Sequence, residues 1–361
     1  MNNHLLNPQV LMIQHGARRR YAVPRMLERA GMLAALYTDS SALSPLGKCC
    51  RMLGPLGNAS MCRLARRIPT GIPPAKIRSA DLSHCGLKNG TEVFHQQHMA
   101  LSKKMIKWGL GSADVVYSMY HEGLDFIRWA KRQGAKSIVD VYINPVTHRV
   151  MAKECESFPD WGRYKSDESV ELGEVLWKET AGLADLLLCP SEWVASGVLE
   201  LTPDSANKIR VVPYGCSIDY GGRIYSPVKG RVLFAGGNAL RKGLHYLGEA
   251  ATNLKSIIPN LDVRIAGGLP ENVVKHPICK DLNFLGKLTS EQMKTEYLSA
   301  DMFVLPSLSE GFAGVVAEAI GAGSPVIVTN EAGSPVMHER EGLIIPSRNP
   351  LALTDAIRRL Y

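Results

Sequence analysis

The chain has 361 residues, of which 45% are hydrophobic and 21% are charged. This length suits two domains, and the composition is that of a folded globular protein and excludes a disordered one. No run of about 18 or more apolar residues occurs, which argues against a transmembrane helix. The first residues lack the basic and long apolar regions of a signal peptide, so we expect a cytoplasmic protein.

Positive charge is concentrated in the first part of the chain. Residues 1–110 hold 16 Lys and Arg against 4 Asp and Glu, whereas the remaining residues hold 26 against 30. The basic part should therefore face something anionic: a membrane surface, a phosphorylated or lipid-linked acceptor, or nucleic acid. The eight cysteines show neither a CxxC pair nor a zinc-type spacing with His, so we expect reduced, mostly buried thiols.

Short apolar strands alternate with amphipathic helices, a pattern typical of βαβ units and parallel sheets. In the first half we expect strands at residues 9–14, 33–38, 114–119, 137–142, 185–189 and 208–213. Helices are expected near residues 21–30, 97–108, 167–183 and 191–201, with one more between the third and fourth strands.

Residues 41–79 interrupt this alternation. They are rich in Gly, Pro, Arg, Leu and Met, and their periodicity is poor, which predicts an irregular basic insertion. The Gly- and Pro-containing stretch 220–230 is the best linker. The predicted organisation is an N-terminal domain at 1–220, a linker at 221–230 and a C-terminal domain at 231–361.

After the linker a second alternating series begins. We expect strands at residues 231–235, 262–266, 283–286, 301–306, 325–329 and 342–345. Helices are expected to begin at Gly243, at Ser290 after a capping box of Thr289 and Gln292, at Gly314, and after the N-cap Asn349. The final helix has Pro350 at its first position, where proline is favoured.

The segment 307–318, SLSEGFAGVVAE, lies between an expected strand end and a helix start. Ligands of open parallel sheets bind at the carboxyl ends of strands, and helix N-termini attract phosphate. Glu310 precedes the helix, and Glu318 lies about one turn inside it with its side chain leaning back. Carboxylates repel a diphosphate, so both would bind hydroxyl groups of a sugar nucleotide. The alternative for each Glu, taken alone, is a capping or solvated carboxylate.

The segment 231–247 combines a strand, a Gly-rich turn and a helix start. Its turn carries two cations, Arg241 and Lys242, which suit a diphosphate because charge-assisted hydrogen bonds are strong. The alternative is a pair of solvated surface cations. Gly236 and Gly237 lie where the backbone would approach such a ligand.

Together these segments resemble glycosyltransferase family 4, the retaining enzymes of the GT-B fold. The segment EGFAGVVAE is similar to that family's two glutamates separated by seven residues. The family's usual motif sequences also resemble three further segments of this chain: ADMFVLPSLSEGF, EAIGAGSPVIVTNEAGS and LRKGLHYL. CPSEWV and VVPYGCSID also look like family segments. The match covers residues 185–361 well and the first half weakly. The resemblance implies an α/β fold of two Rossmann-like parallel-sheet domains facing a cleft.

The implied activity is transfer of a sugar from a nucleotide diphosphate sugar, such as a UDP- or GDP-sugar, to a hydroxyl acceptor, with retention and without a metal. Polysaccharide or glycolipid synthesis in the cell envelope is the implied setting. By resemblance Glu318 holds the ribose, Glu310 contacts the sugar, and Lys242 with Arg241 binds the diphosphate. The remaining donor residues would be Gly236, Gly237, Lys287, Leu288, Gly311, Phe312, Ala313, Gly314 and Val315, with the base near 286–288.

The sequence departs from the family pattern at three places. Family members often carry an Arg where this chain has Gly237, so Arg241 would substitute for it. Many have a His just after the strand that ends here at Tyr142, so His148 and His121 are the candidates for that role, against the alternative of packed or solvated histidines. The chain ends at Tyr361, where the family usually continues, which suggests a shortened C-terminus.

On the acceptor side, Gly16 and Arg18 follow the first strand and are expected to bind an anionic or lipid-linked acceptor; a solvated basic loop is the alternative. The cluster of Arg63, Arg66, Arg67, Lys76 and Arg78 could rest on anionic lipid at the inner face of the membrane. The rival functions are an inactive or nucleotide-sugar-binding relative and a GT-B-like epimerase. A third rival is nucleic-acid binding, but apart from the positive charge of the first part of the chain we find no nucleic-acid-binding motif.

Overall fold

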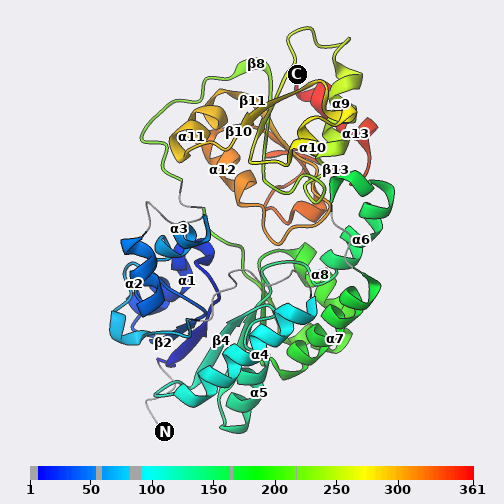
Figure 1. Ribbon diagram of the computed structural model, residues 1–361. Helices are drawn as coiled ribbons and strands as arrows, with labels where there is room; N and C mark the ends of the chain where they lie inside the picture. The colour runs from blue at the N-terminus through cyan, green and yellow to red at the C-terminus, as the bar shows by residue number, and fades with distance from the viewer. Residues whose placement is uncertain (1–6, 54–58, 82–90, 163–165, 217) are drawn as a thin grey trace. The chain divides into compact units, whose positions relative to one another are not determined.

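The computed structural model describes residues 7–53, 59–81, 91–162, 166–216 and 218–361 (Figure 1). The chain divides into two compact units. Unit 1 comprises residues 1–141, 171–188 and 204–210, and unit 2 comprises 142–170, 189–203 and 211–361. The boundary expected at 221–230 stays a prediction.

Unit 1 is built on a parallel sheet that has, within the described residues, seven strands in the order β3-β2-β1-β4-β5-β6-β7. The strands are β1 (Val10–Ile13), β2 (Leu33–Thr38), β3 (Ile77–Ser79), β4 (Val115–Met119), β5 (Lys136–Asp140), β6 (Leu186–Cys189) and β7 (Ile209–Val211). All four residues of β1 are buried, as expected for a central strand covered on both faces. The flanking helices are α1 (Ala22–Arg29), α2 (Pro45–Met52), α3 (Ala59–Ala65), α4 (Thr91–Trp108), α5 (Leu124–Arg132) and α7 (Asp167–Leu183).

Unit 2 contains a second parallel sheet with, in the described part of the chain, six strands in the order β10-β9-β8-β11-β12-β13. These are β8 (Val228–Ala235), β9 (Asp262–Ala266), β10 (Leu282–Gly286), β11 (Ala300–Leu305), β12 (Val326–Thr329) and β13 (Gly342–Ile345). Its helices are α6 (Thr147–Ser157), α8 (Glu192–Leu201), α9 (Leu244–Leu254), α10 (Glu271–Val274), α11 (Ser290–Ser299), α12 (Gly314–Ala322) and α13 (Pro350–Leu360). Helix α9 contacts α13, and α11 contacts α12, so the two pairs flank the sheet (Figure 1).

Most expected elements are confirmed within one to three residues of their predicted ends. The capping box of Thr289 and Gln292 starts α11, and the side chain of Asn349 caps α13 by accepting from Ala352 N. Gly243 caps α9 with φ 70°, a conformation that glycine adopts without strain. These signals are local, which is why the sequence alone could predict them.

The structure departs from the expected local elements at three places. Residues 41–79 were expected to be irregular, yet in their described part they form α2, α3 and β3; residues 54–58 lie outside the described residues. The side chain of Ser44 accepts from Gly47 N and Pro45 follows it, which is an orthodox helix start. Helix α6 was missed because its buried face includes the polar Thr147 and Glu154 and therefore lacks apolar periodicity. In addition, β8 begins at Val228, inside the predicted linker.

Each sheet has one position where the chain reverses the direction in which it adds strands. In unit 1 this position lies between β1 and β4, and in unit 2 it lies between β8 and β11. Loops that leave the carboxyl ends of two such strands diverge and create space for a ligand. The polar residues described next follow these four strands.

Candidate functional site

The site in unit 2 begins with the turn that follows β8. A Cβ atom on Gly236 would lie 2.1 Å from Cδ of Lys242, so only glycine lets the lysine side chain cross the turn. The NH of Arg241 donates to Oδ1 of Asn238, which fixes the turn. Both predicted cations are thereby held in place just before α9 begins.

Glu310, in the loop after β11, lies against both cations. Its Oε1 is 2.9 Å from Nζ of Lys242, and its Oε2 is 2.5 Å from an NH of Arg241. The exposed fractions of the three side chains are only 11% for Glu310, 11% for Lys242 and 19% for Arg241. The structure therefore brings together the three residues that were predicted to act on the sugar and the diphosphate.

The electrostatic state of Glu310 follows from this pairing. Burial alone raises the pKa of a carboxyl group, but Lys242 and Arg241 together lower the pKa of Glu310 below its usual value. Glu310 is consequently an anion at neutral pH. The cluster of one buried carboxylate and two cations carries a net charge of +1, which favours an anionic ligand.

The loop that carries Glu310 is fixed by hydrogen bonds to three other elements. Oγ1 of Thr329, at the end of β12, donates to the carbonyl of Ser307, and Oγ of Ser191 donates to the carbonyl of Gly311. Oγ1 of Thr147, at the start of α6, lies 2.7 Å from Oγ of Ser309. Such supports hold a side chain within the narrow range of geometry that binding requires.

Two glycines allow this loop to pack closely. A Cβ on Gly311 would lie 1.8 Å from the carbonyl oxygen of Tyr142, and one on Gly333 would lie 2.4 Å from the carbonyl oxygen of Gly311. Gly333 also has φ 58°, in the left-handed region. Replacing either glycine would displace the loop that positions Glu310.

Helix α9, which starts just after Lys242, is tied to α6 through a buried carboxylate. Glu154 accepts from the hydroxyl of Tyr246 at 2.6 Å and lies 2.9 Å from Nε2 of His245. Nε of Arg348 donates to its second oxygen. Burial raises the pKa of Glu154, but these hydrogen bonds outweigh burial and lower it to about 2. The start of α9 therefore has a rigid support.

Glu318 lies on the second turn of α12 and is half-buried. Its Oε2 accepts from the hydroxyl of Tyr297 at 2.8 Å, while the hydroxyl of Tyr220 donates to its backbone carbonyl. The carboxylate keeps further lone pairs, so it can still accept from a ribose hydroxyl. The tyrosine fixes the direction in which Glu318 presents them.

The remaining predicted donor residues follow the strand ends of unit 2. Gly237, Gly314 and Lys287 are exposed, Ala313 is buried, and Phe312, Val315 and Leu288 are half-buried. The ring of Phe312 contacts that of Tyr214 at a centroid distance of 5.8 Å. Gly286, the last residue of β10, turns the chain with φ 68°. Their contact with a nucleotide stays a prediction.

The two candidate histidines lie in different units. His148 is on α6 in unit 2, and His121 follows β4 in unit 1. His121 has φ 63°, and its ring contacts that of Tyr120 in a tilted arrangement with a centroid distance of 3.7 Å. Its backbone carbonyl accepts from His98, so it contributes to the network described next.

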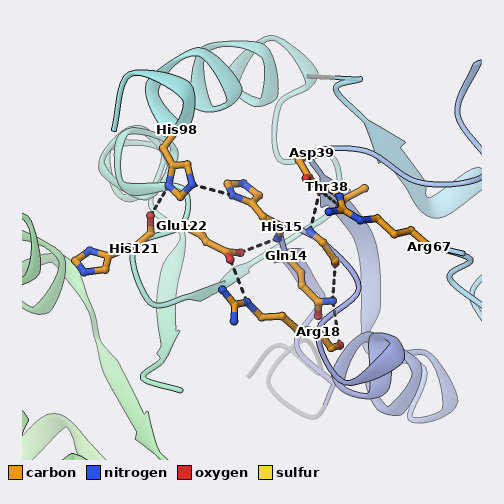
Figure 2. A network of polar contacts seen from close by, with 10 residues as sticks. Gln14, His15, Arg18, Thr38, Asp39, Arg67, His98, His121 and Glu122 are labelled. Atoms are coloured by element: carbon orange, nitrogen blue, oxygen red, sulfur yellow. Dashed lines mark hydrogen bonds and ion pairs between the residues drawn. The ribbon is translucent and has the colours of Figure 1, made fainter. Parts of the chain in front are cut away.

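A second cluster of polar residues follows β1 and β4 in unit 1 (Figure 2). The backbone NH of His15 donates to Oε2 of Glu122 at 2.7 Å, and Nε of Arg18 lies 3.4 Å from Oε1. The NH of Gly16 donates to Oδ1 of Asp39, whose other oxygen pairs with Arg67 at 2.8 Å. The predicted acceptor residues Gly16 and Arg18 thus each lie beside a buried carboxyl group.

Histidines complete this network. Nδ1 of His98 lies 2.6 Å from the carbonyl oxygen of His121 and must therefore carry the proton. Nε2 of His98 and Nδ1 of His15 lie 3.3 Å apart, within hydrogen-bond distance of each other. Sequence reasoning did not find His15, His98, Glu122 or Asp39. A polar residue within three positions of the end of a buried strand was the signal available for His15, Asp39 and Glu122.

Two further features are absent from the described residues. No described helix is long and apolar enough to cross a membrane. Within the same described ranges, no group of three His, Cys, Asp or Glu side chains is arranged to hold a metal ion. The expectation of a reaction without a metal stays a prediction.

Comparison with known proteins shows that this chain is similar to glycosyltransferases. Residues 229–361 match the family model of the glycosyl transferases group 1. The D-inositol 3-phosphate glycosyltransferase of Pseudarthrobacter chlorophenolicus is 26% identical over 278 residues, which cover 70% of this chain and 63% of that protein. The enzyme of the same name from Corynebacterium urealyticum is 29% identical over 150 residues, or 37% of this chain and 35% of that protein.

Among solved structures, sucrose-phosphate synthase from Thermosynechococcus elongatus matches with a TM-score of 0.67 at 17% identity. The match covers 98% of this chain and 90% of that one. Two Rossmann-like parallel-sheet units with this similarity define a fold of the GT-B glycosyltransferase type. The match of residues 229–361 to the glycosyl transferases group 1 confirms the predicted resemblance for that part of the chain. The chain spans less than two thirds of the two curated relatives' lengths.

Proposed function

We propose that this protein transfers a sugar from a nucleotide diphosphate sugar to a hydroxyl group of an acceptor, with retention of configuration. The observation that carries the proposal is the buried triad of Glu310, Lys242 and Arg241 at the switch point of the unit 2 sheet. A net positive pocket with a fixed carboxylate suits a ligand that has phosphates beside hydroxyl groups. The similarity of residues 229–361 to the group 1 glycosyl transferases supports this choice.

In the proposed mechanism Lys242 and Arg241 bind the diphosphate and stabilise the negative charge that develops as it leaves. Because Glu310 already holds both cations, the donor would share them with it, and Glu310 would accept hydrogen bonds from the sugar hydroxyls. Stabilisation of a developing charge by prearranged groups is commonly the largest catalytic term. The backbone of Gly311, Phe312, Ala313, Gly314 and Val315 would line the sugar and phosphate positions.

The nucleoside would bind beside these residues. Glu318, oriented by Tyr297, would accept from the ribose hydroxyls, and the base would lie near Lys287 and Leu288. A UDP- or GDP-sugar is the donor we propose. Gly236 and Gly237 would admit the diphosphate close to the backbone.

The basic surface of unit 1 would hold the protein at the cytoplasmic face of an anionic membrane. Residues 41–80 contain seven Lys and Arg and no Asp or Glu. Exposed apolar side chains lie in the same stretch, with Met52 85% exposed and Leu53 45% exposed. Such a mixture suits an anionic lipid surface and a lipid-linked or glycan acceptor in envelope glycan synthesis.

The donor assignment can be tested by thermal denaturation with a panel of UDP-, GDP- and ADP-sugars. A ligand that binds the folded state raises the melting temperature, so one donor class should stabilise the wild-type protein. Glu318→Ala should lose that stabilisation, whereas Glu271→Ala, on the exposed α10, should retain it. The proposal fails if no nucleotide sugar stabilises the wild type.

Two rivals make different predictions in the same experiments. An epimerase of related fold would release free sugar and nucleotide without an acceptor. An inactive relative would bind the donor but show no release or transfer. Sugar transfer that needs an acceptor and falls sharply in Lys242→Ala would exclude both rivals.

A further inference from the structure

The loop between β1 and α1 has an unusual backbone. Arg19, Arg20 and Tyr21 have φ values of 49°, 50° and 60°, so three successive residues other than glycine are left-handed. Each such residue costs roughly 1–2 kcal/mol. Strain of this kind persists where surrounding contacts impose it, and it occurs most often at functional sites.

Contacts on both sides impose this conformation. Nε2 of the buried Gln14 donates to the carbonyls of Gly16 and Arg18, and an NH of Arg25 donates to the carbonyl of Arg20. Tyr21 is buried and anchors the loop in the core of unit 1. The loop is thus preformed, and it presents consecutive arginines beside the ends of β1 and β4.

Of these arginines, Arg18 turns inward to a carboxyl group that is poorly suited to hold it. Glu122 is only 3% exposed, and its Oε1 lies 3.4 Å from Nε of Arg18, a long contact. Burial raises the pKa of Glu122 to about 8, although Arg18 and the NH of His15 both lower it in part. At neutral pH Glu122 is therefore largely protonated, so it does not supply a full counter-charge to Arg18.

The neighbouring pair behaves differently. Asp39 accepts from Gly16 N at 2.8 Å and from Arg67 at 2.8 Å, and its pKa is lowered despite burial because of these contacts. This pair stays ionised and contributes no net charge. The titratable and charged side chains around Glu122 come from several elements (Figure 2). They are Arg18 and His15 after β1, Asp39 after β2, Arg67 after α3, His98 on α4, and His121 in the same turn as Glu122.

We propose that Arg18 binds an oxyanion of the acceptor, a phosphate or a carboxylate, by turning away from Glu122, which then retains or takes up a proton. The inference rests on the proposed transferase function and names its acceptor class. Arg18 can make this exchange because its side chain is 37% exposed and its contact to Glu122 is long. The site would prefer acceptors that carry a negative charge near the hydroxyl group that receives the sugar.

This exchange predicts a linkage between anion binding and pH. When Arg18 leaves, the pKa of Glu122 rises further, so binding above about pH 8 requires proton uptake and weakens as the pH rises. Below about pH 7 Glu122 already holds its proton, and the affinity should no longer depend on it. An ordinary surface arginine would show neither effect.

The test is calorimetric titration of the full chain at pH 7.5 and 9, at constant ionic strength, with inorganic phosphate and with glucuronate. Glucose is the neutral control. The wild type should bind at least one anion, severalfold more weakly at pH 9, with proton uptake shown by the dependence of the heat on the buffer. The preferred anion distinguishes a phosphorylated from a carboxylated acceptor. If neither anion binds the wild type, the proposal is wrong.

Three variants locate the binding. Arg18→Ala should weaken it at least tenfold, and Glu122→Gln should bind at least as tightly as the wild type with no proton uptake. Arg20→Ala removes the same charge from the same loop and should change the affinity less than twofold. The proposal is overturned if Arg18→Ala binds as well as the wild type, if Arg20→Ala loses as much, or if Glu122→Gln keeps the pH dependence.

Anions can also bind in unit 2, so the titration is repeated with Lys242→Ala, which should retain the Arg18-dependent binding. Loss of that binding in Lys242→Ala would place the anion at the wrong site and contradict the proposal. If anion binding does not depend on Arg18 but a nucleotide sugar still raises the melting temperature, only the inference about the acceptor is rejected. If no nucleotide sugar raises the melting temperature, the proposed transferase function itself is rejected.

Discussion

Glu310 in unit 2 and Glu122 in unit 1 are both buried, and each follows a strand at the switch point of its sheet. Glu310 has two cations within 2.9 Å, and its pKa is lowered. Glu122 has one arginine at 3.4 Å, and its pKa is raised to about 8. Burial alone therefore does not decide the charge of a carboxyl group; the number and distance of its cationic partners do.

The difference separates two kinds of anion site. In unit 2 Glu310 stays ionised, and a ligand with phosphates and hydroxyls has to share Lys242 and Arg241 with this carboxylate. In unit 1 the carboxyl group can become neutral and release its arginine. We expect the Glu310 triad to suit a diphosphate, and the Arg18–Glu122 pair to suit a single phosphate or carboxylate group.

The largest effect should come from removing a cation of the Glu310 triad. Lys242→Ala should lower kcat/KM for sugar transfer by about 100-fold or more, because one lost charge-stabilising group typically costs that much. Initial rates with the donor identified by thermal shift give the measurement. Lys275→Ala, an exposed lysine beyond α10, is the matched control. A reduction below threefold would remove Lys242 from the proposed role.

Neutralising Glu310 should destabilise the protein. Glu310→Gln leaves two partly buried cations without a counter-charge and should cost about 3 kcal/mol at pH 7, measured by urea denaturation. Because the folded-state pKa is lowered, the wild type's advantage should be present above pH 4.5 and disappear as the pH falls through that folded-state pKa. An equal stability of both proteins at pH 7 would contradict the ion-paired state.

Glu122 should show the opposite dependence on pH. Its pKa is raised on folding, so its stabilisation is fully present below the unfolded value near 4.5 and is lost as the pH rises through about 8. Between pH 5.5 and 7.5 the wild type should lose about 2 kcal/mol relative to Glu122→Gln, measured by urea denaturation at both pH values. Parallel stability curves for the two proteins would show that Glu122 does not hold a proton.

The smallest effect should come from the support of Glu318. Tyr297→Phe removes one hydrogen bond at 2.8 Å and should reduce stability by about 1 kcal/mol. The freed carboxylate should raise the KM for the donor severalfold while leaving kcat nearly unchanged. Tyr225→Phe, which loses a hydrogen bond to the backbone of β11, controls for stability. An unchanged donor KM would assign Tyr297 a purely structural role.

The parts of the fold that the sequence predicts depend on local signals. The helix start at Gly243, the capping box at Thr289 and the alternation of strands and helices each depend on a few neighbouring residues. The structure confirms each of them to within about one residue or a few. Helix α6 escaped because Thr147 and Glu154 are buried through hydrogen bonds rather than through apolar packing. A search for hydrophobic periodicity does not detect buried polar residues of this kind.

The candidate site divides in the same way. The residue types of Lys242, Arg241 and Glu310 suggested a diphosphate, but their ion pairs join positions 68 and 69 residues apart, and only the fold brings them together. In unit 1 the contacts of His15 with Glu122 and His98 span 107 and 83 residues. Neither motif nor composition reveals a pairing of that range.

The most direct test of the account compares the affinity for UDP and GDP in two variants, one from each unit. If the triad in unit 2 binds the donor diphosphate, Lys242→Ala should weaken the preferred nucleotide at least tenfold, and Arg18→Ala should leave its affinity within twofold of the wild type. The reverse result, with Arg18 rather than Lys242 required for the nucleotide, would contradict the assignment of the donor site to unit 2.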